Sequence, residues 1–196
     1  MLTKELTLIA MKQRWLEQTL ALCDKCVGEH LYTRADFAQV IERDDQEVFL
    51  LLTPAEKVVG YIYCRLIDVR EAEQLSKQSL QQLDNKVFKA CSLLGILQSI
   101  GISEAYRQQG LSNILVEAYL QWLWRKTAAD IAFGVFWKPH GKAPMGSILE
   151  KFGFYHLTDA QNVWYDNENL ICPVCHGRCR CEAAIYYKIL ERREAE

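Results

Sequence analysis

The amino-acid sequence predicts an α+β fold in which about seven strands and several helices share a core. Apolar runs rich in β-branched and aromatic residues recur along the chain, and segments with apolar residues every three to four positions separate them. The chain has 196 residues, of which 50% are hydrophobic, enough for one domain with a sizeable core. The predicted strands are residues 6–11, 47–52, 58–67, 93–102 and 130–137, one that begins at 154, and 183–190.

The composition argues against several classes of protein. The formal net charge is -2, so we expect no nucleic-acid partner, because such binding normally needs an excess of basic charge. No apolar run approaches the ~20 residues of a membrane span, and we expect no membrane partner. The N-terminal residues do not resemble a signal peptide, which favours a cytoplasmic location, where disulfides are rare. The eight cysteines are therefore expected to be reduced thiols or metal ligands.

The first predicted helix spans residues 13–27, where apolar residues recur at helical spacing, and Gly28 ends it. Cys23 and Cys26 lie on this helix as Cys-x-x-Cys. The same spacing occurs in redox and metal sites. Because no turn signal surrounds the pair, we interpret both residues as small core thiols.

A second helix, a hairpin and a polar segment follow. Thr33 and Asp36 predict a capping box that opens a helix. Residues 47–52 and 58–67 are apolar runs separated by a short turn, which predicts a hairpin whose two faces are both covered. Residues 70–90 are rich in Gln, Glu, Lys and Ser, and their sparse apolar positions predict an amphipathic helix of modest strength.

In residues 93–124 the spacing of the apolar residues changes from that of a strand to that of a helix. Residues 93–102 are apolar and β-branched, as in a buried strand, and residues 103–109 are polar and predict a tight loop. The following residues predict a helix that ends near Lys126. The predicted buried face of this helix contains Leu111, Ile114, Leu115, Ala118 and Trp122.

The start of this helix has the features of an anion site. The first N–H groups of a helix have no partner within it, and they carry the positive end of its dipole. Gly110 has no Cβ, so a ligand can approach the backbone closely, and Ser112 and Asn113 keep the approach open. Arg107 places a guanidinium beside it. The pattern predicts a site for a phosphate or pyrophosphate.

The rest of the chain predicts three strands and one helix. The strand at 130–137 is broken by residues 138–141. Pro144 suits the first turn of a helix that Gly153 stops, and the last two strands follow.

Half of the cysteines fall within ten residues, which we call the knuckle (residues 172–181). Thiolates at this density repel one another unless a cation neutralises them, and Zn²⁺ takes four of them in a tetrahedron. Pro173 and Gly177 give the tight turns that such a site needs. The sequence predicts a structural zinc whose ligands are Cys172, Cys175, Cys179 and Cys181.

Other interpretations of the knuckle stay open. The thiols could be reduced and free of metal, or they could hold an iron–sulfur cluster or serve a redox role. His176 offers an alternative ligand, and one ligand could come from elsewhere, because closing four ligands within ten residues is sterically demanding. Arg178 and Arg180 would offset the negative charge of a Zn(Cys)₄ centre.

Two motifs resemble the GNAT N-acetyltransferase superfamily. Residues 107–112, Arg-Gln-Gln-Gly-Leu-Ser, are similar to its acetyl-CoA motif, and residues 100–106 look like the strand end before it. Residues 148–154, Ile-Leu-Glu-Lys-Phe-Gly-Phe, resemble its second signature. The resemblance implies a single domain over residues 1–196 with a three-layer α/β/α fold and a mixed, mostly antiparallel sheet. It also makes residues 70–90 an insertion, which could be a surface excursion, an arm of a homodimer or a substrate lid.

The resemblance implies an enzyme that moves an acetyl group from acetyl-CoA to a primary amine of a small molecule or peptide by direct attack. The pyrophosphate would meet the amides of residues 108–113, and the pantetheine arm would pair with the strand end. The residues that this implies for acetyl-CoA binding are Ile100, Gly101, Ile102, Arg107, Gln108, Gln109, Gly110, Leu111, Ser112 and Asn113.

The sequence departs from the family pattern at the catalytic acid. Leu149 stands where many members have a Tyr, so the catalytic residues stay open, with His140 and Tyr155 as candidates for proton transfer. The alternative is a non-catalytic acetyl-CoA sensor, or an interaction protein that uses the zinc knuckle. In the resembling fold the last hairpin lies near the acceptor, so Trp164 and Tyr165 are expected to shape the acceptor pocket.

Overall fold

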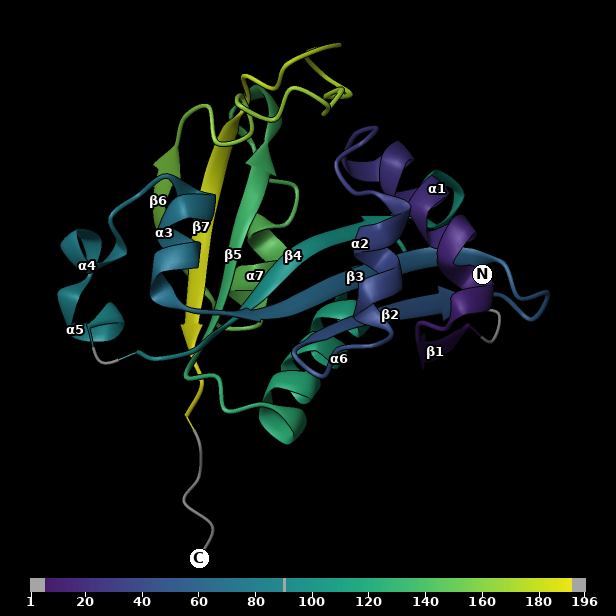
Figure 1. Cartoon of the computed structure of the whole chain (residues 1–196), viewed down its shortest axis with the longest axis horizontal. Coiled ribbons are helices and arrows are strands. Elements are labelled where there is room, and N and C mark those ends of the chain that lie inside the picture. Colours follow the sequence, from purple (N-terminus) through teal and green to yellow (C-terminus); the bar gives the residue numbers. More distant parts are fainter. Residues whose placement is uncertain (1–5, 90, 192–196) are drawn as a thin grey trace, which may run out of the picture.

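A single seven-stranded sheet forms the middle layer of the molecule (Figure 1). The computed structural model describes residues 6–89 and 91–191. The strands lie in the spatial order β1-β2-β3-β4-β5-β7-β6. Their bounds are β1 Thr7–Ala10, β2 Gln46–Leu52, β3 Val58–Ile67, β4 Leu94–Ile102, β5 Ile131–Lys138, β6 Tyr155–Ala160 and β7 Glu182–Ile189.

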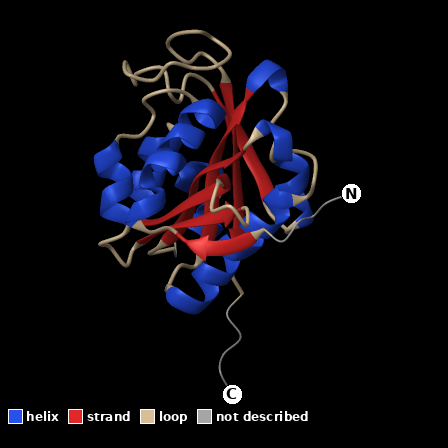
Figure 2. Cartoon of the chain, turned by 90° about the vertical axis from the view of Figure 1, so that its right-hand side faces the viewer, coloured by secondary structure: helices blue, strands red, loops and turns tan. Residues whose placement is uncertain are grey.

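Helices cover both faces of this sheet (Figure 2). Helices α1 and α2 pack on one face through a core that includes Trp15, Phe37 and Tyr61, and α3 to α5 pack beside them over Phe133. Helices α6 and α7 cover the opposite face. The predicted three-layer fold is therefore confirmed. The helices are α1 Leu16–Val27, α2 Arg34–Val40, α3 Val69–Ser76, α4 Leu80–Leu83, α5 Asn85–Phe88, α6 Leu111–Lys126 and α7 Gly146–Lys151, with 3-10 turns η1 Gln13–Trp15, η2 Glu104–Tyr106 and η3 Pro139–Gly141.

Several local predictions are confirmed, because the residues concerned determine the conformation of the backbone next to them. Gly28 follows α1 with a φ of 120°, a conformation that a side chain disfavours. Thr33 and Asp36 form the predicted capping box at the start of α2. Strands β2 and β3 pair antiparallel as the predicted hairpin.

The sheet is antiparallel except between β4 and β5, which confirms the predicted mixed topology. These two strands pair in parallel over four residue pairs, from Leu94 with Ile131 to Leu97 with Gly134. Beyond Leu97 they separate, β4 continuing along β3 and β5 continuing along β7 (Figure 1). A register shift against β3 leaves Gln98 as the extra residue of β4 at the point of separation.

Two predictions about helices need correction. Residues 69–88 form three short helices, α3 to α5, instead of one, with Leu80 and Phe88 fully buried against the sheet. Leu83, another apolar residue of this segment, is 43% exposed. On α6, Ile114 is 42% exposed, because the helix buries Val116, Tyr119 and Leu123 in addition to the other predicted positions.

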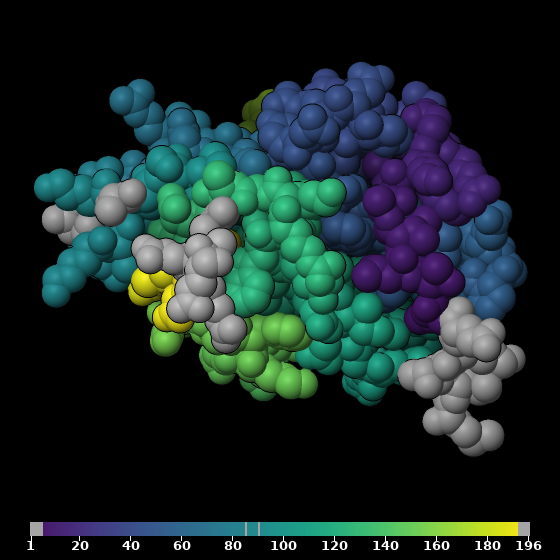
Figure 3. Space-filling view, turned by 90° about the horizontal axis from the view of Figure 1, so that it is seen from below, coloured from purple at the N-terminus to yellow at the C-terminus, as the bar shows by residue number. Residues whose placement is uncertain are grey.

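The insertion and the N-terminal segments lie at opposite ends of the molecule (Figure 3). Within the described part of the chain, no helix combines the length and the hydropathy needed to cross a membrane.

Candidate functional site

A cavity of about 820 Å³ lies where β4 and β5 separate. Because the two strands pair only as far as Leu97, each has an unpaired edge beyond that point. The cavity is lined by both edges, by the loop before α6, by the end of α1 and by part of the knuckle. The topology therefore creates a gap in the middle of the sheet that a ligand can fill.

The edge of β4 offers backbone groups to this cavity. Gly101 lies opposite Tyr61, and the amide of Ser103 donates to the carbonyl of Val59 at 2.8 Å. Since hydrogen bonding alternates along an antiparallel strand, the N–H and C=O groups of Ile100 and Ile102 point away from β3. An extended ligand lying along this edge would meet them as an added strand does.

The carbonyl at the end of β4 already has two side-chain partners. Arg107 Nε donates to Ile102 O at 3.1 Å, and Cys26 Sγ lies 3.6 Å from the same oxygen. The sequence placed the Arg107 guanidinium beside the helix start, and the structure turns it toward the strand. Arg107 lines the cavity and therefore contributes a positive charge to it.

The loop before α6 presents an uncapped helix start. Gly110 is the N-cap with a φ of 76° and no side chain accepts from the first turn, which also has no acidic residue. A Cβ added to Gly110 would meet only Asn113 Nδ2, at 3.5 Å. Gln108 also has a positive φ, 59°. The amides here have the polarity and the open approach that an anionic group requires.

Eight of the ten residues predicted to bind acetyl-CoA line the cavity. They are Ile100, Gly101, Ile102, Arg107, Gln108, Gly110, Leu111 and Ser112. Gln109 and Asn113 are not among the lining residues. Their side chains bind back to the loop, Gln109 Nε2 to Ala105 O at 3.3 Å and Asn113 Nδ2 to Gly110 O at 3.1 Å.

The part of the cavity beside the knuckle is apolar. Leu31, Trp137, Trp164 and Leu170 line it. Among the described residues that line the whole cavity there is no Asp, Glu or His, and Arg107 carries the only formal charge. Trp164 lines the cavity. Tyr165 lies instead under Arg178 and Arg180, whose guanidinium carbons are 5.5 and 5.9 Å from its ring centre.

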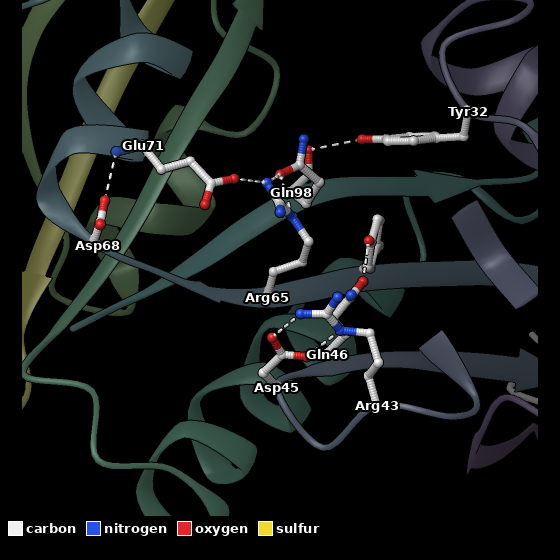
Figure 4. A network of polar contacts seen from close by, with 9 residues as sticks. Tyr32, Arg43, Asp45, Gln46, Arg65, Asp68, Glu71 and Gln98 are labelled. Carbon is white, nitrogen blue, oxygen red and sulfur yellow. Dashed lines mark hydrogen bonds and ion pairs between the residues drawn. The ribbon is translucent and has the colours of Figure 1, made fainter. Parts of the chain in front are cut away.

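Tyr32, in the loop between α1 and α2, reaches the bulge of β4. Its hydroxyl donates to Gln98 O at 3.3 Å, and Figure 4 shows the ring pointing toward that residue. Burial raises the pKa of Tyr32 above its ordinary value, so the phenol is neutral at physiological pH. A neutral phenol beside the gap is a potential proton donor.

The Gln98 side chain is held by a polar network on the outer face of β3 and β4 (Figure 4). Arg65 Nε donates to Gln98 Oε1 at 3.2 Å, and Arg65 Nη2 donates to Glu71 Oε1 of α3 at 2.8 Å. A second cavity of about 430 Å³ with a polar lining lies here and shares Leu31, Tyr32 and Gln98 with the first. The insertion thereby helps to fix the bulge.

Of the Cys-x-x-Cys pair, Cys23 belongs to the core, as predicted, whereas Cys26 is half-buried and lines the cavity. Cys23 is 1% exposed and its sulfur lies 3.0 Å from the hydroxyl of Tyr61. Burial raises the pKa of Cys23 to about 12, and burial also raises the pKa of Cys26. Both thiols are therefore protonated and unreactive at neutral pH. Ser99 Oγ is buried in the same region, without a hydrogen-bond partner among the described residues.

The two candidates for proton transfer lie outside the cavity lining. His140 is exposed in the turn after β5, with a φ of 51°. Tyr155 begins β6, is 64% exposed and lies against Tyr187. Neither residue lines the gap between β4 and β5. Sequence reasoning missed Tyr32, whose only local signal is its place directly before the capping box at Thr33.

The knuckle brings the four predicted ligands together. The sulfur atoms of Cys172, Cys175, Cys179 and Cys181 all lie within 4.8 Å of one another. The turn is closed by two backbone hydrogen bonds, Cys172 N to Gly177 O at 3.0 Å and His176 N to Cys172 O at 2.9 Å. His176 is exposed and not part of this group. No ligand from elsewhere is needed to complete a set of four thiols.

The fold resembles several solved acetyltransferases. Arabidopsis thaliana NAA60 in complex with acetyl-CoA has a TM-score of 0.71 at 10% identity, with 95% of this chain and 99% of that chain covered. The NatC complex bound to Gag peptide and CoA has a TM-score of 0.64 at 15% identity, with 95% and 99% covered. The mosquito arylalkylamine N-acetyltransferase like 5b has a TM-score of 0.63 at 15% identity, with 95% and 100% covered. At these identities the likeness establishes the fold alone.

Sequence comparison identifies the family directly. Among curated proteins no sequence matches the chain. The model of the acetyltransferase (GNAT) family matches residues 13–136, which is well over half of the chain and includes the strand, loop and helix around Gly110. The chain therefore belongs to the GNAT acetyltransferase family.

Proposed function

We propose that the protein is an N-acetyltransferase that moves an acetyl group from acetyl-CoA to a primary amine. One observation carries this proposal: the open edge of β4, with the groups of Ile100 and Ile102 directed away from β3, adjoins the uncapped start of α6 in one cavity. A family member with both features can hold a diphosphate at the helix start and a pantetheine arm along the strand.

The proposed residues for acetyl-CoA follow from this arrangement. The amides of residues 108–113 would bind the pyrophosphate, and the edge of Ile100 to Ile102 would bind the pantetheine. The thioester would then lie near the bulge at Gln98, where a backbone N–H of the edge polarises its carbonyl.

The reaction requires few side chains of the protein. The neutral amine attacks the thioester carbon, a C–N bond forms, the C–S bond breaks and CoA leaves as a thiolate or thiol. Positioning the two reactants supplies much of the rate, so no nucleophilic residue is required. We propose Tyr32 as the donor that passes a proton to the thiolate, because its neutral hydroxyl lies at the bulge, and the phenol then regains a proton from water that has accepted the amine proton. We assign no residue as base, because the described lining contains no carboxylate or imidazole, and water takes the proton of the amine.

We further propose that the knuckle holds a structural Zn²⁺ through its four cysteines. The support is the convergence of all four sulfurs and the closure of the turn by backbone hydrogen bonds. Four thiolates complete the tetrahedral shell of Zn²⁺, so the metal would have no open position for catalysis. Elemental analysis of the purified chain should find one zinc per molecule, and the Cys172→Ser variant should lose it.

Turnover separates this enzyme from a non-catalytic acetyl-CoA sensor. With a panel of primary amines and acetyl-CoA, the enzyme should release free CoA with at least one amine, measured with a thiol reagent after protein removal. Binding of acetyl-CoA without any release across the panel would favour the sensor.

Gly110→Leu tests the binding site itself. The new side chain would occupy the approach to the helix start, and we expect the affinity for acetyl-CoA to fall about tenfold or more in calorimetry. Gly141→Leu is the matched control, because Gly141 has nearly the same φ, 74°, has no atom near its Cβ position and does not line the cavity. Equal affinity of the two variants would contradict the proposed site.

A further inference from the structure

The knuckle and the two residues before it, Leu170 and Ile171, contact both walls of the gap between β4 and β5. On one side, Ile171 N donates to Glu29 O at 3.1 Å, in a bridge that follows α1. A Cβ on Gly28 would lie 2.7 Å from Leu170 Cδ1 and 2.9 Å from Ile171 O, so the two segments pack in direct contact. On the other side, the knuckle core of Leu170, Cys172 and Cys179 packs against Trp137 at the end of β5.

Residues 161–181 contain turns and one isolated bridge, but no helix or strand. The first part of this segment is anchored by Val163 in the core and by Lys77, which binds Asn162 O at 2.8 Å and Asp166 at 2.6 Å. The buried residues of the second part are Leu170, Cys172 and Cys179, which also line the cavity. A cation that binds the four sulfurs would join the two ends of the knuckle and fix it on the start of β7.

A buried donor beside the sulfurs supports a thiolate centre. The indole N–H of Trp137 is buried and has no hydrogen-bond partner at normal distance within the described chain, although it lies beside Cys181. Metal-bound cysteine sulfurs accept such N–H groups, which orient them and offset their charge. If a metal keeps the cysteines as thiolates, a thiolate sulfur would therefore be a charged acceptor for this N–H.

The two parts of the cavity have separate supports. The knuckle adjoins Leu31 and the end of β5, whereas the loop before α6 is tied to β4 by the bond from Arg107 to Ile102 O. Loss of a metal would loosen the first part and leave the second in place. The wall beside the knuckle is formed mainly by Leu31, Trp137, Trp164 and Leu170, and it also includes Asn167 and the buried cysteines Cys172 and Cys179. Its large apolar side chains would accept an apolar substituent of the amine.

From these observations we propose that Zn²⁺ in the knuckle clamps the acceptor wall of the cavity, and that this wall selects amines that carry an apolar group. The inference rests on the proposed acetyltransferase function. It adds to that function a metal-dependent acceptor site and a chemical class of acceptor.

Hydrogen–deuterium exchange tests the clamp without any turnover. The full chain is compared in its zinc-loaded form and after treatment with a chelator. The amide of Ile171 should exchange at least about tenfold faster after metal removal, because its hydrogen bond to Glu29 O is lost. Amides of residues 103–113 should change less than about twofold, and calorimetry should give the same acetyl-CoA affinity for both forms. Unchanged exchange at the amide of Ile171 would overturn the clamp, whether or not the protein is an enzyme.

Steady-state kinetics tests whether the acceptor wall selects amines that carry an apolar group. With phenylethylamine as acceptor, chelation should raise the KM for the amine at least about tenfold and leave the KM for acetyl-CoA unchanged. Spermidine should be the poorer acceptor of the zinc-loaded protein. The Cys91→Ser variant, which alters a half-buried thiol outside the knuckle, should behave as the unaltered chain.

The acceptor site and the metal clamp can be contradicted by different results. Preference for spermidine, or an equal rise in both KM values, would overturn the acceptor site. No turnover with any amine, together with the expected exchange difference, would contradict the proposed function and support the clamp.

Discussion

At the scale of single residues, the contacts of Gln98 hold the bulge of β4 at the gap between β4 and β5. Its carbonyl accepts from Tyr32, and its side chain accepts from Arg65, which in turn binds Glu71 of the insertion. Three segments far apart in the sequence thus meet at one bulge. The hydroxyl of Tyr32 is the group that we propose acts on the thioester there.

Replacing Tyr32 by Phe removes this hydroxyl and keeps the ring packing against Phe37 and Tyr63. We expect kcat to fall by about 10²-fold, the lower end of the effect of a general acid, with little change in the KM for acetyl-CoA. Because burial raises the pKa of Tyr32, the proton stays on the phenol as pH rises. The unaltered enzyme should therefore show no alkaline loss of kcat from this group below about pH 10.

Tyr155→Phe is the matched control, since it makes the same chemical change at a side chain that does not line the cavity. A larger loss of kcat in this variant than in Tyr32→Phe would return Tyr155 to the role that the sequence suggested.

At the scale of elements, the insertion is a packed layer of the fold. Leu80 and Leu83 lie on the same short helix, α4, but Leu80 is 0% exposed and Leu83 is 43% exposed. Leu80→Ala would remove buried atoms and leave a cavity, at a cost of about 2–5 kcal/mol in the free energy of unfolding. Leu83→Ala should change it by less than about 0.5 kcal/mol. Urea denaturation of both variants measures the difference, and similar values would mean that the insertion contributes little to the core.

The sequence predicted most elements, because their signals are local. Gly28 ends a helix, Thr33 and Asp36 cap one, and a change of period at Gly110 separates a strand from a helix. The helix face that includes Ile114 was misjudged because periodicity alone does not say how wide a buried face is. The three short helices of the insertion were missed because most residues of this segment are polar. Its few apolar residues are buried against the sheet, and that contact does not show in the local sequence pattern.

The part of the site that one continuous segment forms was predictable from the sequence. The parts that need residues from several segments were not. The end of β4, the loop and the start of α6 are one continuous segment that carries its own backbone chemistry, and eight of the ten residues predicted there line the cavity. Tyr32 and Trp137 enter from other segments, so no local pattern marks them. The grouping of the four knuckle thiols was predictable for the same reason as the loop, since all of them lie within ten residues.

At the scale of the whole molecule, the proposed zinc should contribute to global stability. A ligand present at 1,000 times its dissociation constant stabilises the folded state by about 4 kcal/mol. For a chain of this length each kcal/mol shifts the unfolding temperature by about 2–4 °C, so chelation should lower the midpoint by roughly 8–16 °C. Calorimetric scans with and without chelator measure the shift, and the Cys91→Ser variant should show the same shift as the unaltered chain. A midpoint insensitive to chelation would contradict a structural metal.

Strand β7 lies between β5 and β6 although it is the last strand in the chain. During synthesis, β5 and β6 therefore emerge from the ribosome without the strand that joins them. The knuckle emerges immediately before β7, so a nascent chain that binds the proposed zinc there would deliver β7 already anchored at one end. Zinc supply during translation would then determine how much of the newly made protein folds before its unpaired strand edges meet those of another chain.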